Sequence, residues 1–259
     1  MSELVKVLVL VCPLVFLAGF IDSVAGGGGV VSLSAYLIAG LPAHMAAGSN
    51  KFTMSFGTSV AAAKYMRSGK VLLSVALPSA AGALAGSAIG ANLALLIEER
   101  ALQLVLLGAL PCVALFLALS GNFGMMARPE KTDGRLAAAC KSFGIGLLIG
   151  GYDGLIGPGT GSFLILAFSG LLGMDLLTAS GCAKVSNLAS NIAALLVFIL
   201  NGKVYYAAAL PAMLFCMVGN WVGAQYAIKG GSARVKKMMW VVLALLFIKT
   251  VMDLLGLRF

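Results

Sequence analysis

In the segment "GGYDGLIGPGTGSFLILAFSGL" (residues 150–171), an aspartate and a glycine–proline break interrupt a strongly apolar run. A second segment, "AGFIDSVAGGGGVVSLSAYLIAGL" (18–41), has the same order of features near the N-terminus. Glycine and proline disfavour helix, and four consecutive glycines lower helix stability with no packing advantage. Both segments therefore predict helices that are broken inside an apolar environment.

The composition of the 259-residue chain is typical of a membrane protein. Hydrophobic residues make up 61% of the sequence, charged residues make up 10%, and the mean hydropathy is +1.03. A soluble domain contains about 45–50% apolar and about 25% charged residues. Because the apolar excess extends along the whole chain, the sequence predicts an all-α polytopic membrane protein. The net charge of +9 is typical of basic cytoplasmic loops, so it does not indicate a nucleic-acid partner.

Six segments are long enough to cross a bilayer, which takes about 20 apolar residues in a helix. They are residues 45–66, 71–96, 101–119, 178–200, 204–228 and 235–255. Two further pairs of shorter pieces flank the glycine breaks: 4–21 with 30–41, and 136–156 with 162–173. The segment 45–66 contains a lysine and several polar residues among its apolar residues. The glycines of "GALAGSAIG" (82–90), in the segment 71–96, predict close helix packing.

The two halves of the sequence match each other at offsets of 131 to 133 positions. Asp22 matches Asp153, and "GSNKFT" (48–53) matches "GCAKVS" (181–186). The loops "SGKV" (68–71) and "NGKV" (201–204) match at the same spacing. The chain is therefore predicted to be a tandem duplication, with a first membrane repeat at 1–120, a cytoplasmic linker at 121–135 and a second membrane repeat at 136–259.

Two topologies are compatible with this duplication. If each glycine break forms a re-entrant hairpin, each repeat has three full crossings and the second repeat is inverted relative to the first. If 4–21 and 136–156 cross fully, the chain has eight spans and parallel repeats. The distribution of lysine and arginine favours inverted repeats, because the basic cluster at 229–237 then lies on the same side as most other basic residues.

Lys51 and Lys184 lie several residues inside apolar segments, where a charge costs about 2.5–3.5 kcal/mol on insertion scales and indicates a function. In one interpretation, the two ammonium groups bind an anion between the repeats. In the other, they are structural ion pairs, Lys51 with Asp22 and Lys184 with Asp153. The two aspartates are assigned either to charge balance or to proton coupling.

Irregular backbone at membrane depth is tolerated where protein or a wet cavity satisfies it, and it marks the binding sites of transporters. Helix N-termini that follow such breaks also attract anions. The predicted substrate site therefore combines the two lysines with nearby polar residues and glycines: Ser49, Asn50, Thr53, Ser186, Asn187, Gly26, Gly27, Gly28, Gly29, Gly157, Gly159, Thr160 and Gly161.

The two halves of this site are not chemically equal, because Asn50 matches Ala183 and Asn187 matches Met54. This difference predicts an asymmetric ligand or an asymmetric pose. A cation or proton antiporter that uses Asp22 and Asp153 is the alternative function.

Enzymatic and metal-dependent functions have little support in the sequence. There is one histidine, His44, and the five cysteines form no CxxC pair. HExxH and GxSxG motifs are also absent, so we expect no enzyme, no metal and no cofactor.

The sequence resembles the TauE/SafE family, also called the 4-toluene sulfonate uptake permease family. The resemblance lies in the aspartate and glycines at the start of each break: Asp22 with Gly26, Gly28 and Gly29, and Asp153 with Gly157, Gly159 and Gly161. The "GSNKF" stretch and the paired "GKV" loops carry the same resemblance. The resemblance implies a multi-pass secondary transporter of the cytoplasmic (inner) membrane that moves sulfite, sulfonates or related organic anions. Its expected partners are a small anionic substrate and the lipid bilayer, and a homodimer is one alternative for its oligomeric state.

Overall fold

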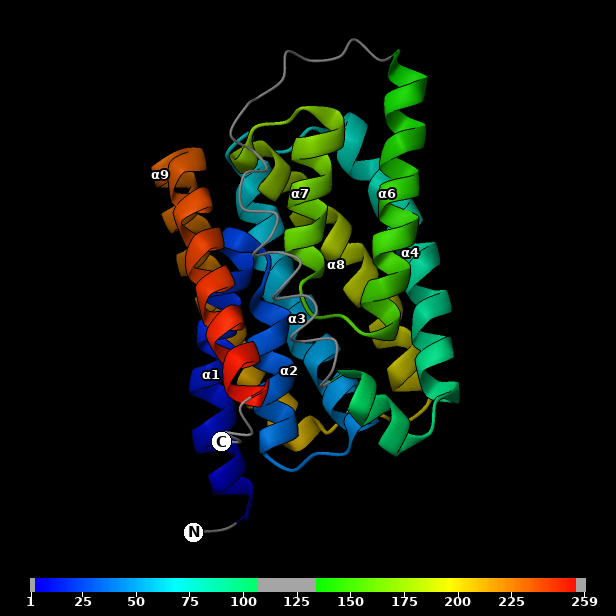
Figure 1. Ribbon diagram of the computed structural model, residues 1–259, viewed down its shortest axis with the longest axis vertical. Helices are drawn as coiled ribbons and strands as arrows, with labels where there is room; N and C mark the ends of the chain where they lie inside the picture. The colour runs from blue at the N-terminus through cyan, green and yellow to red at the C-terminus, as the bar shows by residue number, and fades with distance from the viewer. Residues whose placement is uncertain (1–2, 107–133, 255–259) are drawn as a thin grey trace.

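A computed structural model describes residues 3–106 and 134–254, and these residues are helical with short connections and no strand. The helices are α1 (Glu3–Ala25), α2 (Gly28–Ile38), α3 (Ala43–Arg67), α4 (Leu73–Leu96), α6 (Arg135–Leu155), α7 (Thr160–Leu172), α8 (Leu176–Leu200) and α9 (Tyr206–Leu254) (Figure 1). The all-α prediction is confirmed for these residues. Most of the predicted span at 101–119 and most of the predicted linker at 121–135 lie outside the described residues.

Four helical segments in the described part of the chain are long and apolar enough to cross a membrane: Val7–Ala25, Leu73–Leu96, Leu176–Leu200 and Tyr206–Val241. The helices α2 and α7 are apolar but shorter. Large apolar side chains such as Leu148 and Leu200 point outward and are 76% and 84% exposed. An apolar outer surface of this kind suits lipid, so the protein is a polytopic membrane protein.

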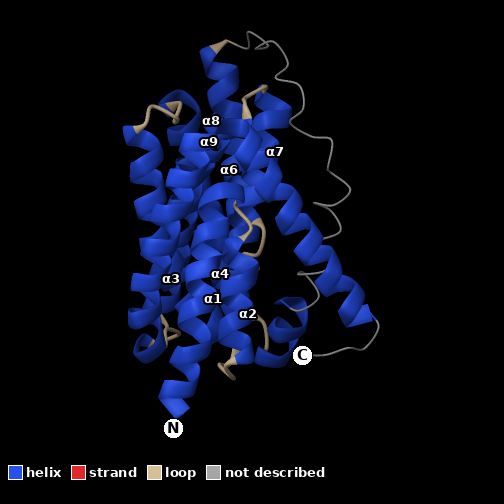
Figure 2. Ribbon diagram, turned by 90° about the vertical axis from the view of Figure 1, so that its left-hand side faces the viewer, coloured by secondary structure: helices blue, strands red, loops and turns tan. Residues whose placement is uncertain are grey.

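The helix α9 differs from the two separate spans that the sequence predicts at 204–228 and 235–255. It runs from Tyr206 to Leu254 and is interrupted only at Gly231, which has φ 64° and ψ −165°. A glycine reaches this backbone region without strain, so the two helical parts join without a loop. Figure 2 shows the C-terminal part of α9 leaning away from the bundle.

The two broken helices form two hairpins that open toward opposite ends of the molecule. The chain turns at Gly26 (φ 80°) between α1 and α2, and at Gly157 (φ 92°) and Gly159 (φ 83°) between α6 and α7. In Figure 1 the N-terminus and the end of α2 lie toward the bottom, whereas α6 begins and α7 ends toward the top. The hairpin tips therefore meet in the middle of the bundle.

Each half of the chain packs its long helices against the other half. The helix α1 lies along α9, and α4 lies along α6. On α4, a Cβ at Gly82, Gly86 or Gly90 would overlap main-chain carbonyl oxygens of α6, those of Phe143, Leu147 and Gly151. The predicted small-residue stripe at 82–90 is therefore a helix-packing surface, and its partner is α6.

A matched pair of contacts links the repeated sequence motifs. A Cβ at Gly48 would overlap the carbonyl oxygen of Lys203, and a Cβ at Gly181 would overlap the carbonyl oxygen of Lys70. The glycine of each "GSNK" or "GCAK" stretch thus packs against the "GKV" loop of the other half. This contact explains why both motifs recur at the same spacing.

We expect Gly86→Ala to lower stability by about 1–3 kcal/mol, because the added methyl group forces α4 and α6 apart at a close-packed crossing. The thermal unfolding midpoint of the protein in detergent measures this effect. Gly144→Ala on α6 is the control, because a Cβ there meets nothing within 4 Å. Equal midpoints for the two variants would contradict a close crossing at Gly86.

Candidate functional site

The glycine breaks of the two hairpins touch each other through their main chains. A Cβ at Gly26 would overlap Gly161, and a Cβ at Gly29 would lie 3.7 Å from the carbonyl oxygen of Gly157. The Ser162 hydroxyl donates a hydrogen bond of 2.7 Å to the carbonyl oxygen of Ala25 across this contact. Glycine is needed at Gly26 and Gly161, where the two backbones approach more closely than side chains allow, whereas a Cβ at Gly29 would make an ordinary contact.

The crossing of the hairpins pairs each lysine with the aspartate of the other half. Lys51 Nζ lies 2.7 Å from Asp153 Oδ2, and Lys184 Nζ lies 2.8 Å from Asp22 Oδ2. The alternative pairing within each half, Lys51 with Asp22 and Lys184 with Asp153, is wrong. Because each hairpin tip reaches into the opposite half, its aspartate meets the lysine of that half rather than its own. All four side chains are buried.

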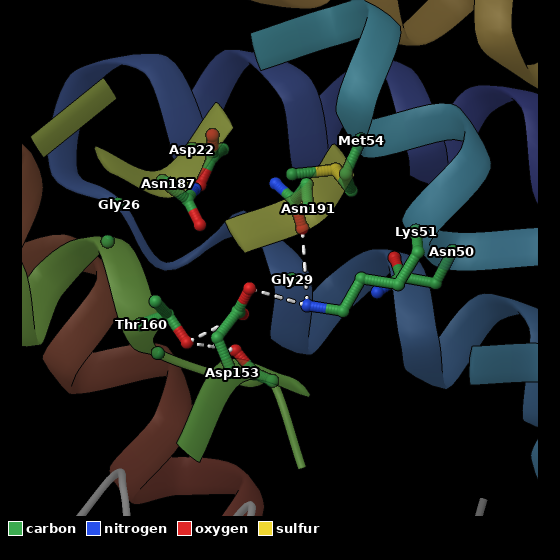
Figure 3. Close-up of a pocket in the computed structure, with 13 residues that line it drawn as sticks. Asp22, Gly26, Gly29, Asn50, Lys51, Met54, Asp153, Thr160, Asn187 and Asn191 are labelled. Atoms are coloured by element: carbon green, nitrogen blue, oxygen red, sulfur yellow. Dashed lines mark hydrogen bonds and ion pairs between the residues drawn. The ribbon is translucent and has the colours of Figure 1, made fainter. Parts of the chain in front are cut away.

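The two ion pairs differ in their surroundings. Asp153 also accepts hydrogen bonds from Thr160 Oγ1 (2.8 Å) and Ser190 Oγ (2.6 Å). Lys51 also donates to Asn191 Oδ1 at 3.2 Å (Figure 3). Lys184 instead donates a second hydrogen bond to the main-chain oxygen of Asp22. The Lys184–Asp22 pair is therefore tied to the backbone at the end of α1, whereas Lys51 is held by side chains alone.

A small cavity lies between the hairpin tips and the helices α3 and α8. Its volume is about 10 Å³, which is about the room that one water molecule needs. Figure 3 shows Lys51 and Asp153 meeting at this cavity. The lining residues are Asp22, Gly26, Gly29, Asn50, Lys51, Met54, Asp153, Gly157, Gly159, Thr160, Gly161, Asn187 and Asn191.

The remaining predicted site residues lie outside this lining. Ser49 Oγ accepts a hydrogen bond from the Tyr205 amide, and Thr53 Oγ1 donates to the main chain of its own helix. Ser186 Oγ donates to the Cys182 carbonyl oxygen. Gly27 is the N-cap of α2, and Gly28 packs against α1. The ammonium group of Lys184 donates a hydrogen bond to the Asp22 carboxylate.

Two lining residues, Asn191 and Met54, were not assigned to the site from the sequence. Asn191 follows Asn187 by one helical turn, and residues four apart share a face of a helix. That spacing was the available signal. Among the described residues, no group of three histidine, cysteine or acidic side chains could hold a metal ion.

The chain matches the family described as Sulfite exporter TauE/SafE over residues 11–250, which include both breaks and both lysines. The chain belongs to the TauE/SafE family. No solved structure matches it.

Relatives of this TauE/SafE protein are named as membrane transporters. It is 37% identical to "Probable membrane transporter protein ORF9" of a Sinorhizobium species, over 92% of this chain and 90% of the relative. It is 33% identical to "Probable membrane transporter protein YfcA" of Escherichia coli K12, over 92% and 87%. A Haemophilus influenzae relative with a similar name is 30% identical, over 92% of both chains. The protein is therefore a membrane transporter of the TauE/SafE family.

The helices of this TauE/SafE protein that carry the two lysines are fixed at their N-terminal ends by acidic groups. Glu99, beyond the end of α4, accepts hydrogen bonds from the amides of Ala43 and His44 and contacts the His44 ring. Burial alone raises the Glu99 pKa, but the His44 hydrogen bond and charge and the two amides lower it below its ordinary value. Asp175 caps α8 in the same way, through the Leu177 and Thr178 amides.

We expect Glu99→Ala to destabilise the protein by about 0.5–2 kcal/mol at pH 7, as the loss of a helix N-cap does. The pKa of Glu99 is lower in the folded protein than in the unfolded chain, where it is about 4.3. The ionised carboxylate therefore stabilises the fold at pH values above about 4.3, and this stabilisation is lost as the pH falls through the folded-state pKa.

Unfolding midpoints at pH 7 and at about pH 3, below the ordinary glutamate pKa, test this prediction. The difference between wild type and Glu99→Ala should shrink at the lower pH. Glu98→Ala is the control, because the neighbouring Glu98 is exposed. A Glu99→Ala variant as stable as the control at pH 7 would contradict the capping role.

Proposed function

We propose that this TauE/SafE protein is a secondary transporter of small sulfur-containing anions, such as sulfite and sulfonates, in the cytoplasmic membrane. The observation that carries the proposal is the cavity where two broken helices cross beside the Lys51 ammonium group. The helices α2 and α7 begin at this crossing, and helix N-termini favour anions. The family description names sulfite, whereas the names of the relatives give no substrate.

We also propose that the halves are inverted repeats, at 1–120 and 136–259, and that each glycine break is a re-entrant hairpin. The opposite openings of the two hairpins support inversion, because parallel repeats would open toward the same end (Figure 1). The matched contacts of Gly48 with Lys203 and of Gly181 with Lys70 support a repeated architecture. An inverted pair of broken helices around a central site suits alternating access from the two sides.

The charges at the crossing determine how an anion can bind. The two lysines and two aspartates carry no net charge, and each lysine is already paired. An anion that binds Lys51 therefore competes with the Asp153 carboxylate, because an extra uncompensated charge in a buried site is strongly unfavourable. Neutralisation of Asp153 by a proton removes this competition, and it would couple anion movement to proton movement.

This competition separates an anion carrier from a cation or proton antiporter built on the aspartates. In an anion carrier, Asp153→Asn frees Lys51 and keeps or raises the affinity for sulfite. Lys51→Met should weaken sulfite binding about 10- to 100-fold, because a charged hydrogen-bond donor worth about 1.5–3 kcal/mol is lost.

Sulfite binding to the purified protein by calorimetry, and sulfite flux in liposomes, measure these effects. Lys237→Met is the control, because Lys237 is exposed on α9. A folded Asp153→Asn variant that loses sulfite binding while Lys51→Met keeps it would overturn the proposal and favour the antiporter.

A further inference from the structure

We infer that the transported anion binds on one side of the crossing only, at Lys51 and the carboxamides of Asn50, Asn187 and Asn191. The Lys184–Asp22 pair is then a fixed structural pair. This inference rests on the proposed anion transport, and it adds which of the two lysines holds the ligand and which side chains select it.

The two lysines differ in their access to free space. Lys184 is 0% exposed and does not line the cavity, and its ammonium group is bound to both the carboxylate and the main-chain oxygen of Asp22. Lys51 lines the cavity and is bound to Asp153 and Asn191. An ammonium group has three N–H donors, so Lys51 keeps one donor for a ligand in the cavity.

The carboxamides around Lys51 present donors to the same space. Asn191 Oδ1 accepts from Lys51, and because an ammonium group only donates, this bond fixes the orientation of the carboxamide. Asn50 Oδ1 accepts from the Ser32 hydroxyl. Both residues line the cavity, and because each Oδ1 already accepts a hydrogen bond, each carboxamide presents its Nδ2 group as a donor.

Asn187 is the most informative of the three. It is 4% exposed and lines the cavity. A carboxamide that faces a cavity offers two N–H donors and one acceptor oxygen to the molecule that occupies it. Its position therefore makes Asn187 a contact for the ligand, or for the water that the ligand replaces.

The equivalent positions in the other half cannot form such a site. Asn50 matches Ala183, Asn187 matches Met54, and Asn191 matches Thr58. Only the Lys51 side therefore combines an ammonium group with three carboxamides. Several N–H donors around one cation suit a head group with several anionic oxygens, such as sulfite or a sulfonate, and they do not suit a metal cation.

Paired variants test this assignment while keeping the buried charges balanced. Lys51→Met with Asp153→Asn removes one ion pair, and Lys184→Met with Asp22→Asn removes the other. Neutralising both partners avoids an unpaired buried charge, so both variants are expected to fold. Sulfite flux in liposomes and sulfite binding in detergent are measured for each, and the unfolding midpoint reports the fold.

We expect the Lys51–Asp153 variant to lose sulfite binding at least tenfold. We expect the Lys184–Asp22 variant to keep sulfite binding or to bind more tightly, because Asp22 lines the cavity and its negative charge opposes an anion there. Asn187→Met, which places the residue of the equivalent Met54 position on the Lys51 side, should weaken binding at least tenfold. Leu196→Met is its matched control on the same helix, because Leu196 is 56% exposed and does not line the cavity.

The possible failures can be told apart. If wild type transports sulfite and the two paired variants lose binding equally, or if Asn187→Met binds as tightly as wild type, the one-sided site is overturned and anion transport stands. If wild type transports neither sulfite nor the sulfonate taurine, the proposed function is overturned and this inference with it.

Discussion

The contact between the two glycine breaks is the constraint on which the site depends. Gly26 and Gly161 meet main chain to main chain, and this approach requires that neither has a side chain. The contact carries each hairpin tip into the opposite half, so that Asp153 reaches Lys51 and Asp22 reaches Lys184. Without the crossing, four buried charges would lack partners. The glycines thus fix both the fold centre and the charge balance of the site.

The two halves of the molecule have matched packing, whereas the two ion pairs at its centre have unequal surroundings. The glycine contacts with the "GKV" loops and the long helix pairs α1–α9 and α4–α6 recur in both halves. At the crossing, Lys184 is tied to the backbone of α1, whereas Lys51 faces a cavity with three asparagines. Lys184 therefore suits a fixed structural role. Lys51 suits an ion pair whose partner a ligand can replace.

Local signals in the sequence were sufficient for the helices and for the breaks between them. The apolar segments and glycine clusters gave α3, α4 and α8 to within about two residues, and helix ends vary by that much between definitions. The pairing of Lys51 with Asp153 could not be predicted, because it depends on a crossing between segments about 100 residues apart. The loop-free joint at Gly231 was missed because it depends on packing rather than on local composition. Asn191 was left out of the site although its position one helical turn after Asn187 was a local signal for it.

The most direct test of anion binding at the crossing is a crystal structure of the protein with selenite, a heavier analogue of sulfite whose anomalous signal locates it. The cavity has room for about one water molecule, so selenite enters only if Lys51 and Asp153 separate. The account predicts a selenium peak between these two side chains, with oxygens about 3 Å from Lys51 Nζ and within hydrogen-bonding distance of the Asn187 carboxamide. A peak bound to Lys184, or an ordered selenite only on the outer surface with the cavity unchanged, would contradict it.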